Sequence, residues 1–230
     1  MVATGITHAL IVGDGDGPAR AALDAAWPGW ADGAELVIAA DGGFRKAAVA
    51  GLRVDLLVGD GDSLGEAGLA EARATGVPVQ LAQVAKDETD LELAVLAAVA
   101  RGAARLTILG ALGGPRFDHA LANAWLLAHP GIAGTPAVLL DATTRVRLLA
   151  GPAEVSLSGT PGDLVSLLPF GGDAEGVTTR GLAYPLHAEP LRIGPARGIS
   201  NVRTGPEAHV ALLAGRLLIV ETYLPEGGLP

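Results

Sequence analysis

The sequence predicts an α/β fold: a mostly parallel sheet with helices on both faces in its N-terminal part, followed by an all-β sandwich in its C-terminal part. Up to about residue 143, short apolar segments alternate with helix-like segments, which is typical of a parallel sheet covered by helices. Beyond residue 144 the composition shifts to Gly, Pro, Thr, Val and Leu, with frequent turn residues and no amphipathic helix. A chain of 230 residues, 50% of them hydrophobic, is long enough for two such domains.

The first domain is expected over residues 1–143. Its strand-like segments are apolar throughout, as expected for strands that are buried on both faces. We expect strands at 8–12, 36–40, 54–58, 77–81, 105–109 and 137–140, and helices at 18–26, 44–50, 65–75, 88–101 and 117–128. This order predicts a Rossmann-like domain, in which ligands bind outside the carboxyl ends of the strands.

The second domain is expected over residues 144–230. Its apolar segments are short and are separated by turn residues, a pattern typical of a β-sandwich. We expect strands at 145–149, 154–158, 164–169, 175–180, 191–193, 197–203, 208–213 and 216–221.

Charge and composition argue against several classes of protein. A formal net charge of −9 argues against a nucleic acid partner, because phosphate backbones need a basic surface, but a single nucleotide needs only a few local cations. There is no cysteine, which excludes disulfides, zinc–thiolate sites and cysteine nucleophiles. The longest uncharged apolar run, Leu93–Ala100, is far shorter than the roughly 20 residues of a membrane span. No basic segment followed by an apolar core opens the chain, so we expect a cytoplasmic protein without a membrane partner.

Acidic turns follow four of the expected strands. The most informative is Gly59-Asp60-Gly61-Asp62-Ser63, because two carboxylates one residue apart can converge on one hard cation. If the strands are parallel, all four turns line one edge of the sheet. Magnesium prefers one or two carboxylates together with the oxygens of a phosphate substrate. The four turns therefore suggest a metal and phosphate site, and they comprise residues 41–43, 59–63, 86–90 and 113–119.

Each turn also has an ordinary structural interpretation. Gly and Asp are common turn residues, so the Asp-x-Asp segment could be a polar turn. Asp87 could be a helix N-cap with Asp90 three residues later, and Asp118 could cap the next helix. His119 and Asn123 share a face of that helix, where a histidine is commonly a structural hydrogen-bonding residue.

Familiar nucleotide motifs are absent. The chain contains no G-x-x-x-x-G-K-[ST] segment and no serine nucleophile elbow. The segment Gly13–Pro18 lacks the third glycine of the dinucleotide fingerprint and fails the calcium-loop pattern. We interpret it as a turn after the first strand that could line a nucleotide site.

The ordered motifs, taken together, closely resemble the thiamine pyrophosphokinase family. The resemblance rests on residues 41–43, 59–63, 86–90, 116–123 and 200–201 and covers nearly the whole chain. It implies transfer of a diphosphoryl group from ATP to the hydroxyl of thiamine, which gives thiamine diphosphate and AMP. It also implies Mg²⁺ and a homodimer whose thiamine sites lie at the subunit interface.

The resemblance further implies roles for individual residues. The metal and phosphate ligands would be Asp60, Asp62 and Asp90. Either Asp41 or Asp118 would be the base that takes charge from the attacking hydroxyl, and the sequence does not choose between them. ATP binding would involve the neighbouring residues Lys86, Asp87, Thr89, Arg116, His119 and Asn123.

The thiamine contacts implied by the resemblance lie in the second domain. Tyr184 stands where the family commonly has Trp, and its ring could stack on the thiamine cation, although a half-buried sandwich residue is the structural alternative. Ser200 and Asn201 could hydrogen-bond the pyrimidine edge. Val202 departs from the Glu often found at that position.

Three other functions remain alternatives at this point. A related diphosphokinase acting on a hydroxymethylpterin would keep the acidic sheet edge without needing Tyr184, Ser200 and Asn201. A non-catalytic nucleotide-binding module would bind ATP without releasing AMP. A metal-dependent phosphohydrolase would release AMP without any acceptor.

Overall fold

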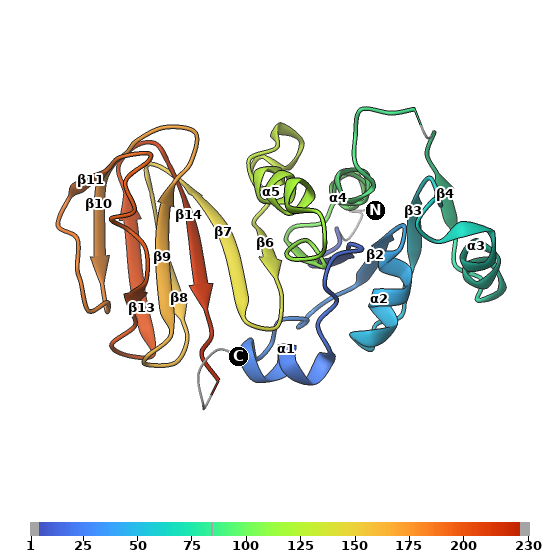
Figure 1. Cartoon of the computed structure of the whole chain (residues 1–230), viewed down its shortest axis with the longest axis horizontal. Coiled ribbons are helices and arrows are strands. Elements are labelled where there is room, and N and C mark those ends of the chain that lie inside the picture. The colour runs from blue at the N-terminus through green and yellow to red at the C-terminus, as the bar shows by residue number, and fades with distance from the viewer. Residues whose placement is uncertain (1–4, 84, 226–230) are drawn as a thin grey trace. The chain divides into compact units, whose positions relative to one another are not determined.

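The computed structural model describes residues 5–83 and 85–225, and the chain divides into two compact units, one ending at Ala142 and the other starting at Thr143. The first unit contains a parallel sheet with the strand order β6-β5-β1-β2-β3-β4 (Figure 1). The strands are β1 Ala9–Val12, β2 Leu36–Ala40, β3 Leu56–Gly59, β4 Val79–Leu81, β5 Leu106–Leu109 and β6 Ala137–Leu140.

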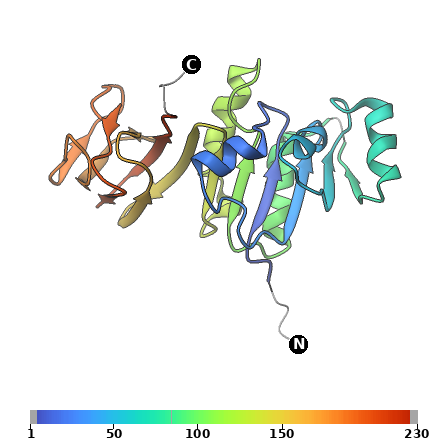
Figure 2. The same cartoon turned by 90° about the horizontal axis from the view of Figure 1, so that it is seen from below.

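Helices cover both faces of this sheet, which confirms the predicted α/β architecture. They are α1 Arg20–Ala26, α2 Gly43–Val49, α3 Gly65–Ala74, α4 Asp90–Ala100 and α5 Phe117–Leu126, with a short 3₁₀ helix, η1, at Pro130–Ile132. Helices α1 and α2 lie on one face, and α4 and α5 lie on the other (Figure 1). Figure 2 shows α1 in front of the strands and α4 behind them.

The position of β1 in the sheet determines where a ligand can bind. Strand β1 pairs with both β2 and β5, so the strand order reverses beside it. The loops after β1 and β5 leave the sheet in different directions, and such a switch point is the usual ligand site of a doubly wound sheet.

Helix α4 begins and ends on local sequence signals. Thr89 is its N-cap, and the Thr89 hydroxyl accepts a hydrogen bond from the Glu92 backbone N–H at 3.1 Å. At the other end, Gly102 adopts a φ of +81° and its N–H bonds the Val99 carbonyl, as in a Schellman motif. The predicted cap at Asp87 is therefore wrong, because Thr89 has the extended backbone and the correct spacing to reach the first free N–H groups.

The second unit is a sandwich of two antiparallel sheets, as predicted. One sheet has the order β12-β9-β14-β7 and the other has the order β11-β10-β13-β8. The strands are β7 Thr144–Ala150, β8 Ala153–Ser158, β9 Leu164–Pro169, β10 Ala174–Arg180, β11 Glu189–Leu191, β12 Asn201–Val202, β13 Glu207–Leu212 and β14 Arg216–Thr222. Their inward-facing side chains form one apolar core that includes Leu157, Leu167, Val210 and Ile219.

The expected strand at 197–203 is mostly wrong, because only Asn201 and Val202 form a strand there. Gly198 lies so close to β9 that a Cβ atom on it would be 2.1 Å from the Leu167 carbonyl oxygen. Ser200 then takes a left-handed φ of +57°. The chain therefore meets β9 at Gly198, whose carbonyl accepts a hydrogen bond from the Leu167 N–H at 2.8 Å, and it runs as a strand beside β9 only from Asn201.

Among the residues that the structure describes, no helix is both long enough and apolar enough to cross a membrane.

Candidate active site

A cavity of about 500 Å³ opens at the switch point of the parallel sheet. Its size falls within the range typical of small-molecule sites. The wall residues come from the loops that follow the first five strands, β1 to β5, and from the starts of α4 and α5. They include Gly13, Asp14, Asp41, Asp60, Asp62, Ser63, Lys86, Glu88, Thr89, Asp90, Gly110, Arg116, His119 and Asn123.

Three glycines, Gly13, Gly15 and Gly110, allow the loops after β1 and β5 to pass close to each other. Gly110 has a φ of +63°, and a Cβ atom on it would lie 2.3 Å from the Gly13 carbonyl oxygen. The Gly15 N–H donates to the Gly110 carbonyl at 2.9 Å. Only glycine permits this approach, which exposes the backbone of both loops to the cavity.

Four carboxylates converge in this cavity. Asp41, Asp60, Asp62 and Asp90 each offer an oxygen, and these oxygens all lie within 4.8 Å of one another. Asp41 and the Asp60–Asp62 turn follow the neighbouring strands β2 and β3, and Asp90 is the first residue of α4. The sheet edge thus brings together the acids that the sequence predicted to meet.

Asp41 is the most constrained of the four acids. It is 3% exposed and has a φ of +40°, a left-handed conformation that is uncommon outside glycine. Its Oδ2 accepts a hydrogen bond from the Ser63 backbone N–H at 2.9 Å, whereas Oδ1 is buried and has no partner in the described part of the chain. Burial, more than any other influence, raises the pKa of the Asp41 carboxyl above its ordinary value.

Lys86 lies between two of the acids. Its ammonium is 2.8 Å from Asp60 Oδ2 and 2.7 Å from Asp90 Oδ1. Burial tends to lower the pKa of Lys86, but the hydrogen bonds to the two carboxylates outweigh it, so that pKa is raised. The hydrogen bond from Lys86 also lowers the pKa of Asp60.

The turn interpretation of the Asp-x-Asp segment holds alongside the site interpretation. Asp60 Oδ1 accepts a hydrogen bond from the Asp62 backbone N–H at 3.1 Å, so this carboxylate shapes its own turn. Its second oxygen, Oδ2, faces Lys86 in the cavity. One residue therefore serves both the local turn and the shared acidic cluster.

Two of the site residues predicted in the first unit, Asp118 and Asp87, lie outside the cavity wall. Asp118 is exposed, does not line the cavity and pairs with Arg116 at 2.6 Å, which lowers the pKa of Asp118 to about 2. It is not a helix cap either, because α5 begins at Phe117 and Arg116 occupies the cap position. Asp87 is also exposed and outside the cavity wall.

Helix α5 directs His119 and Asn123 to the cavity wall, one turn apart. The Asn123 side-chain amide donates to the Ala111 carbonyl at 2.8 Å and so holds the loop after β5. Two wall residues to which the sequence analysis gave no individual role are Ser63 and Gly110. The available signals were that Gly110 directly follows β5 and that Ser63 belongs to the acidic turn after β3.

The predicted thiamine contacts lie in the second unit. Tyr184 is 71% exposed, and with Asn201 it lines a small cavity of about 170 Å³. Asn201 binds the Tyr184 backbone through both atoms of its amide group. Ser200 is exposed beside this cavity but does not line it, and its N–H donates to Ser166 Oγ at 3.0 Å.

Comparisons with known proteins match both units. Residues 29–139 match the family described as thiamin pyrophosphokinase, catalytic domain, and residues 154–217 match the thiamin pyrophosphokinase vitamin B1 binding domain. The thiamine pyrophosphokinase of Bacillus subtilis (strain 168) is 27% identical over 195 residues, which cover 84% of this chain and 90% of that protein.

Solved structures agree with this match. The Bacillus subtilis thiamine pyrophosphokinase structure has a TM-score of 0.78 at 25% identity and covers 94% of this chain and 99% of its own. A thiamin pyrophosphokinase family protein from Enterococcus faecalis has a TM-score of 0.79 at 26% identity, with 95% and 100% of the two chains covered.

The fold, the acidic cavity and these matches define an ATP-dependent diphosphotransferase. More specifically, the chain belongs to the thiamin pyrophosphokinase family. None of the comparisons favours the pterin diphosphokinase or the non-catalytic alternative.

Proposed function

We propose that this chain transfers the diphosphoryl group of ATP to the hydroxyl of thiamine, giving thiamine diphosphate and AMP. The observation that carries the proposal is the group of four converging carboxylates in the unit that matches the catalytic domain. In this reaction the thiamine oxygen forms a bond to the β-phosphorus of ATP. The bond from that phosphorus to the oxygen bridging the α- and β-phosphates breaks, and that oxygen leaves with AMP.

The acidic cluster is suited to hold Mg²⁺. Its donors are all carboxylate oxygens, the ligands that this hard cation prefers, and the buried Asp41 Oδ1 has no partner among the described residues. Asp60, Asp62 and Asp90 would hold the ion, with Asp41 beside them. When bound, the ion would neutralise charge on the transferred phosphates.

The protein's own residues would position ATP and accept the proton. Lys86 and Arg116 supply positive charge at the cavity wall, and Thr89, His119 and Asn123 supply hydrogen-bonding groups. Asp41 is suited to accept the proton of the thiamine hydroxyl, because it lines the cavity and its Oδ1 has no hydrogen-bond partner among the described residues. We do not assign this role to Asp118, which is paired with Arg116 and lies outside the cavity wall.

The second unit would bind thiamine. The exposed ring of Tyr184 can stack on the thiamine cation, an interaction that contributes roughly 0.5–2 kcal/mol. The exposed hydroxyl of Ser200 can hydrogen-bond the pyrimidine. Following the family resemblance, we further propose a cytoplasmic homodimer in which each thiamine site combines residues of both subunits.

The direct test measures AMP formed from ATP and Mg²⁺ with thiamine, with a hydroxymethylpterin and with no acceptor. We expect AMP only with thiamine. Equal AMP formation without an acceptor would indicate a phosphohydrolase, and AMP formation only with the pterin would indicate the related diphosphokinase. ATP binding without any AMP release would indicate a non-catalytic module.

A further inference from the structure

We propose that Arg203 is a positioning residue for thiamine binding. Its buried contacts hold the backbone of the neighbouring Asn201, and Asn201 in turn fixes the backbone of Tyr184. The inference rests on the proposed function, in which thiamine binds against the Tyr184 ring.

The first step is the contact between Asn201 and Tyr184. Asn201 Oδ1 accepts hydrogen bonds from the Tyr184 N–H at 3.0 Å and from the Val202 N–H at 2.9 Å, while its Nδ2 donates to the Tyr184 carbonyl at 2.7 Å. Both lone pairs of the amide oxygen are therefore used by the backbone. The amide oxygen is thus committed to the backbone, and one N–H of Nδ2 remains for the pyrimidine contact that the family resemblance implies. The same amide determines where the Tyr184 backbone lies.

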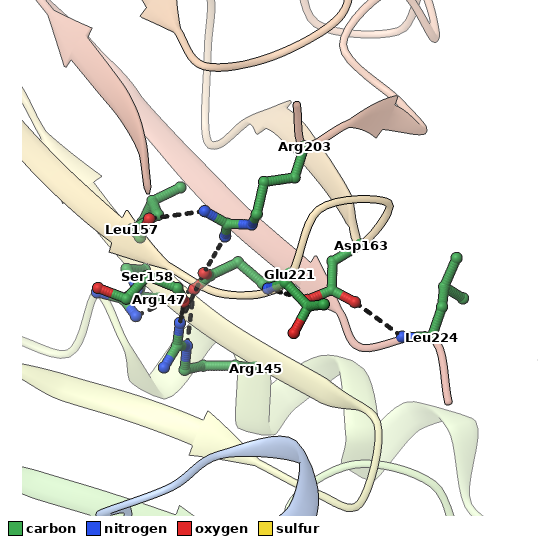
Figure 3. Close-up of polar contacts among 9 residues, drawn as sticks. Arg145, Arg147, Leu157, Ser158, Asp163, Arg203, Glu221 and Leu224 are labelled. Carbon is green, nitrogen blue, oxygen red and sulfur yellow. Dashed lines mark hydrogen bonds and ion pairs between the residues drawn. The ribbon is translucent and has the colours of Figure 1, made fainter. Parts of the chain in front are cut away.

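The second step is the anchoring of Arg203, two residues further along the same segment. Its N–H donates to the Asp163 carbonyl at 2.8 Å, and its own carbonyl accepts from the Gly162 N–H at 2.9 Å. Its guanidinium donates to the Leu157 carbonyl at 2.6 Å and to Glu221 Oε1 at 3.0 Å (Figure 3). Because Leu157 lies on β8 and Glu221 lies on β14, this side chain links the two sheets of the sandwich.

Arg203 is an unusual residue to bury. It is 2% exposed and is among the largest fully buried side chains of the described chain. A buried charge must be paired and hydrogen-bonded, and a buried ion pair is weak evidence for a gain in stability over apolar residues of similar size. A geometric role, holding one segment in a single place against both sheets, accounts for its contacts better than stability does.

Arg147, a second arginine partner of Glu221, provides the matched control for this idea. Glu221 is the carboxylate that Arg147 and Arg203 share. It is also 2% exposed, and it binds Arg145 through two hydrogen bonds of 2.7 Å and Arg147 through one of 3.0 Å (Figure 3). Arg147 lies on β7, away from the segment that carries Asn201. Removal of either Arg147 or Arg203 still leaves Glu221 with two arginine partners, so neither substitution creates an unpaired buried carboxylate.

The test compares Arg203→Met with Arg147→Met. We expect Arg203→Met to raise the KM for thiamine about tenfold, the scale of ordering one residue's backbone on binding, with little change in kcat or in the KM for ATP. Arg203→Lys, which keeps the charge, should show a smaller rise. Arg147→Met should match the wild type in all three constants. A wild-type thiamine KM in Arg203→Met, or an equal rise in Arg147→Met, would overturn the proposal.

Two further measurements keep the test decisive. If Arg203→Met does not fold, Asn201→Ala replaces it, and a wild-type thiamine KM in that variant would overturn the proposal.

Hydrogen exchange at the Tyr184 amide can be measured without substrate. The exchange should be faster than in the wild type in Arg203→Met, or in Asn201→Ala where that variant is used, and unchanged in Arg147→Met. If the wild-type protein shows no turnover of thiamine, the proposed function is refuted, but faster exchange at the Tyr184 amide in the variant would still support the positioning role. Unchanged exchange would refute the positioning role itself.

Discussion

Replacing Asp41 with Asn should abolish most of the activity without weakening the fold. The substitution removes a negative charge from the acidic cluster and keeps the shape of the side chain. Asn is also among the few residues that tolerate a left-handed backbone, so the φ of +40° should survive. The Ser63 N–H can still donate to the amide oxygen.

The expected magnitudes follow from the surroundings of Asp41. Loss of a group that accepts a proton in the transition state typically lowers turnover about 10²–10⁴-fold. Stability should respond differently. Because burial raises the folded-state pKa of Asp41, the stability that this group contributes is full below its unfolded pKa and is lost as the pH rises through the folded pKa. A neutral Asn avoids that loss, so the Tm at neutral pH should be equal to or higher than that of the wild type.

Asp118→Asn is the matched control, with the same chemical change at an exposed position. Its turnover should stay within about fivefold of the wild type, because an exposed ion pair such as that with Arg116 contributes little. The assay is thiamine-dependent AMP release, with Tm measured on the same preparations. Near-wild-type turnover in Asp41→Asn, or an equal loss in Asp118→Asn, would refute this assignment.

Four other outcomes are expected. Chelation by EDTA should stop turnover and added Mg²⁺ should restore it, whereas full turnover in excess EDTA would contradict the metal site. Asp60→Asn should turn over at least about a hundredfold more slowly than the wild type, the scale of losing one electrostatic stabiliser. Mixed Asp62→Asn and Tyr184→Ala subunits, each weak alone, should regain activity after subunit exchange, whereas no recovery after proven exchange would place each site within one chain. Burial lowers the folded-state pKa of His8, so the stability that His8 contributes is present above its unfolded pKa, near 6.5, and is lost as the pH falls. The Tm of the wild type should therefore drop more than the Tm of His8→Gln between pH 7.5 and 5.5, two values about one unit either side of that pKa. Equal drops in the two proteins would contradict this reasoning.

The strands and the acidic site were predictable because both follow from local patterns. Continuous apolar runs identified all six strands of the first unit to within about two residues at each end, since strands buried on both faces leave little ambiguity. The convergence of Asp41 with Asp60 and Asp62 required only that parallel strands end at one edge.

The failures concern contacts that depend on the full three-dimensional arrangement. The sequence could not separate Asp41 from Asp118, because whether Asp118 reaches the cavity wall depends on how α5 leaves the sheet. The anchoring pair of Arg203 and Glu221 was missed, although Glu221 continues the period-two pattern of Leu217 and Ile219 and so had to face the core.

The central claim is that a diphosphoryl group moves as one unit from ATP to thiamine. Its most direct test follows ATP labelled at the γ-phosphate through a time course with thiamine and Mg²⁺. The label should enter thiamine diphosphate from the earliest times, with one AMP released for each thiamine diphosphate formed. Accumulation of ADP together with thiamine monophosphate would contradict the claim.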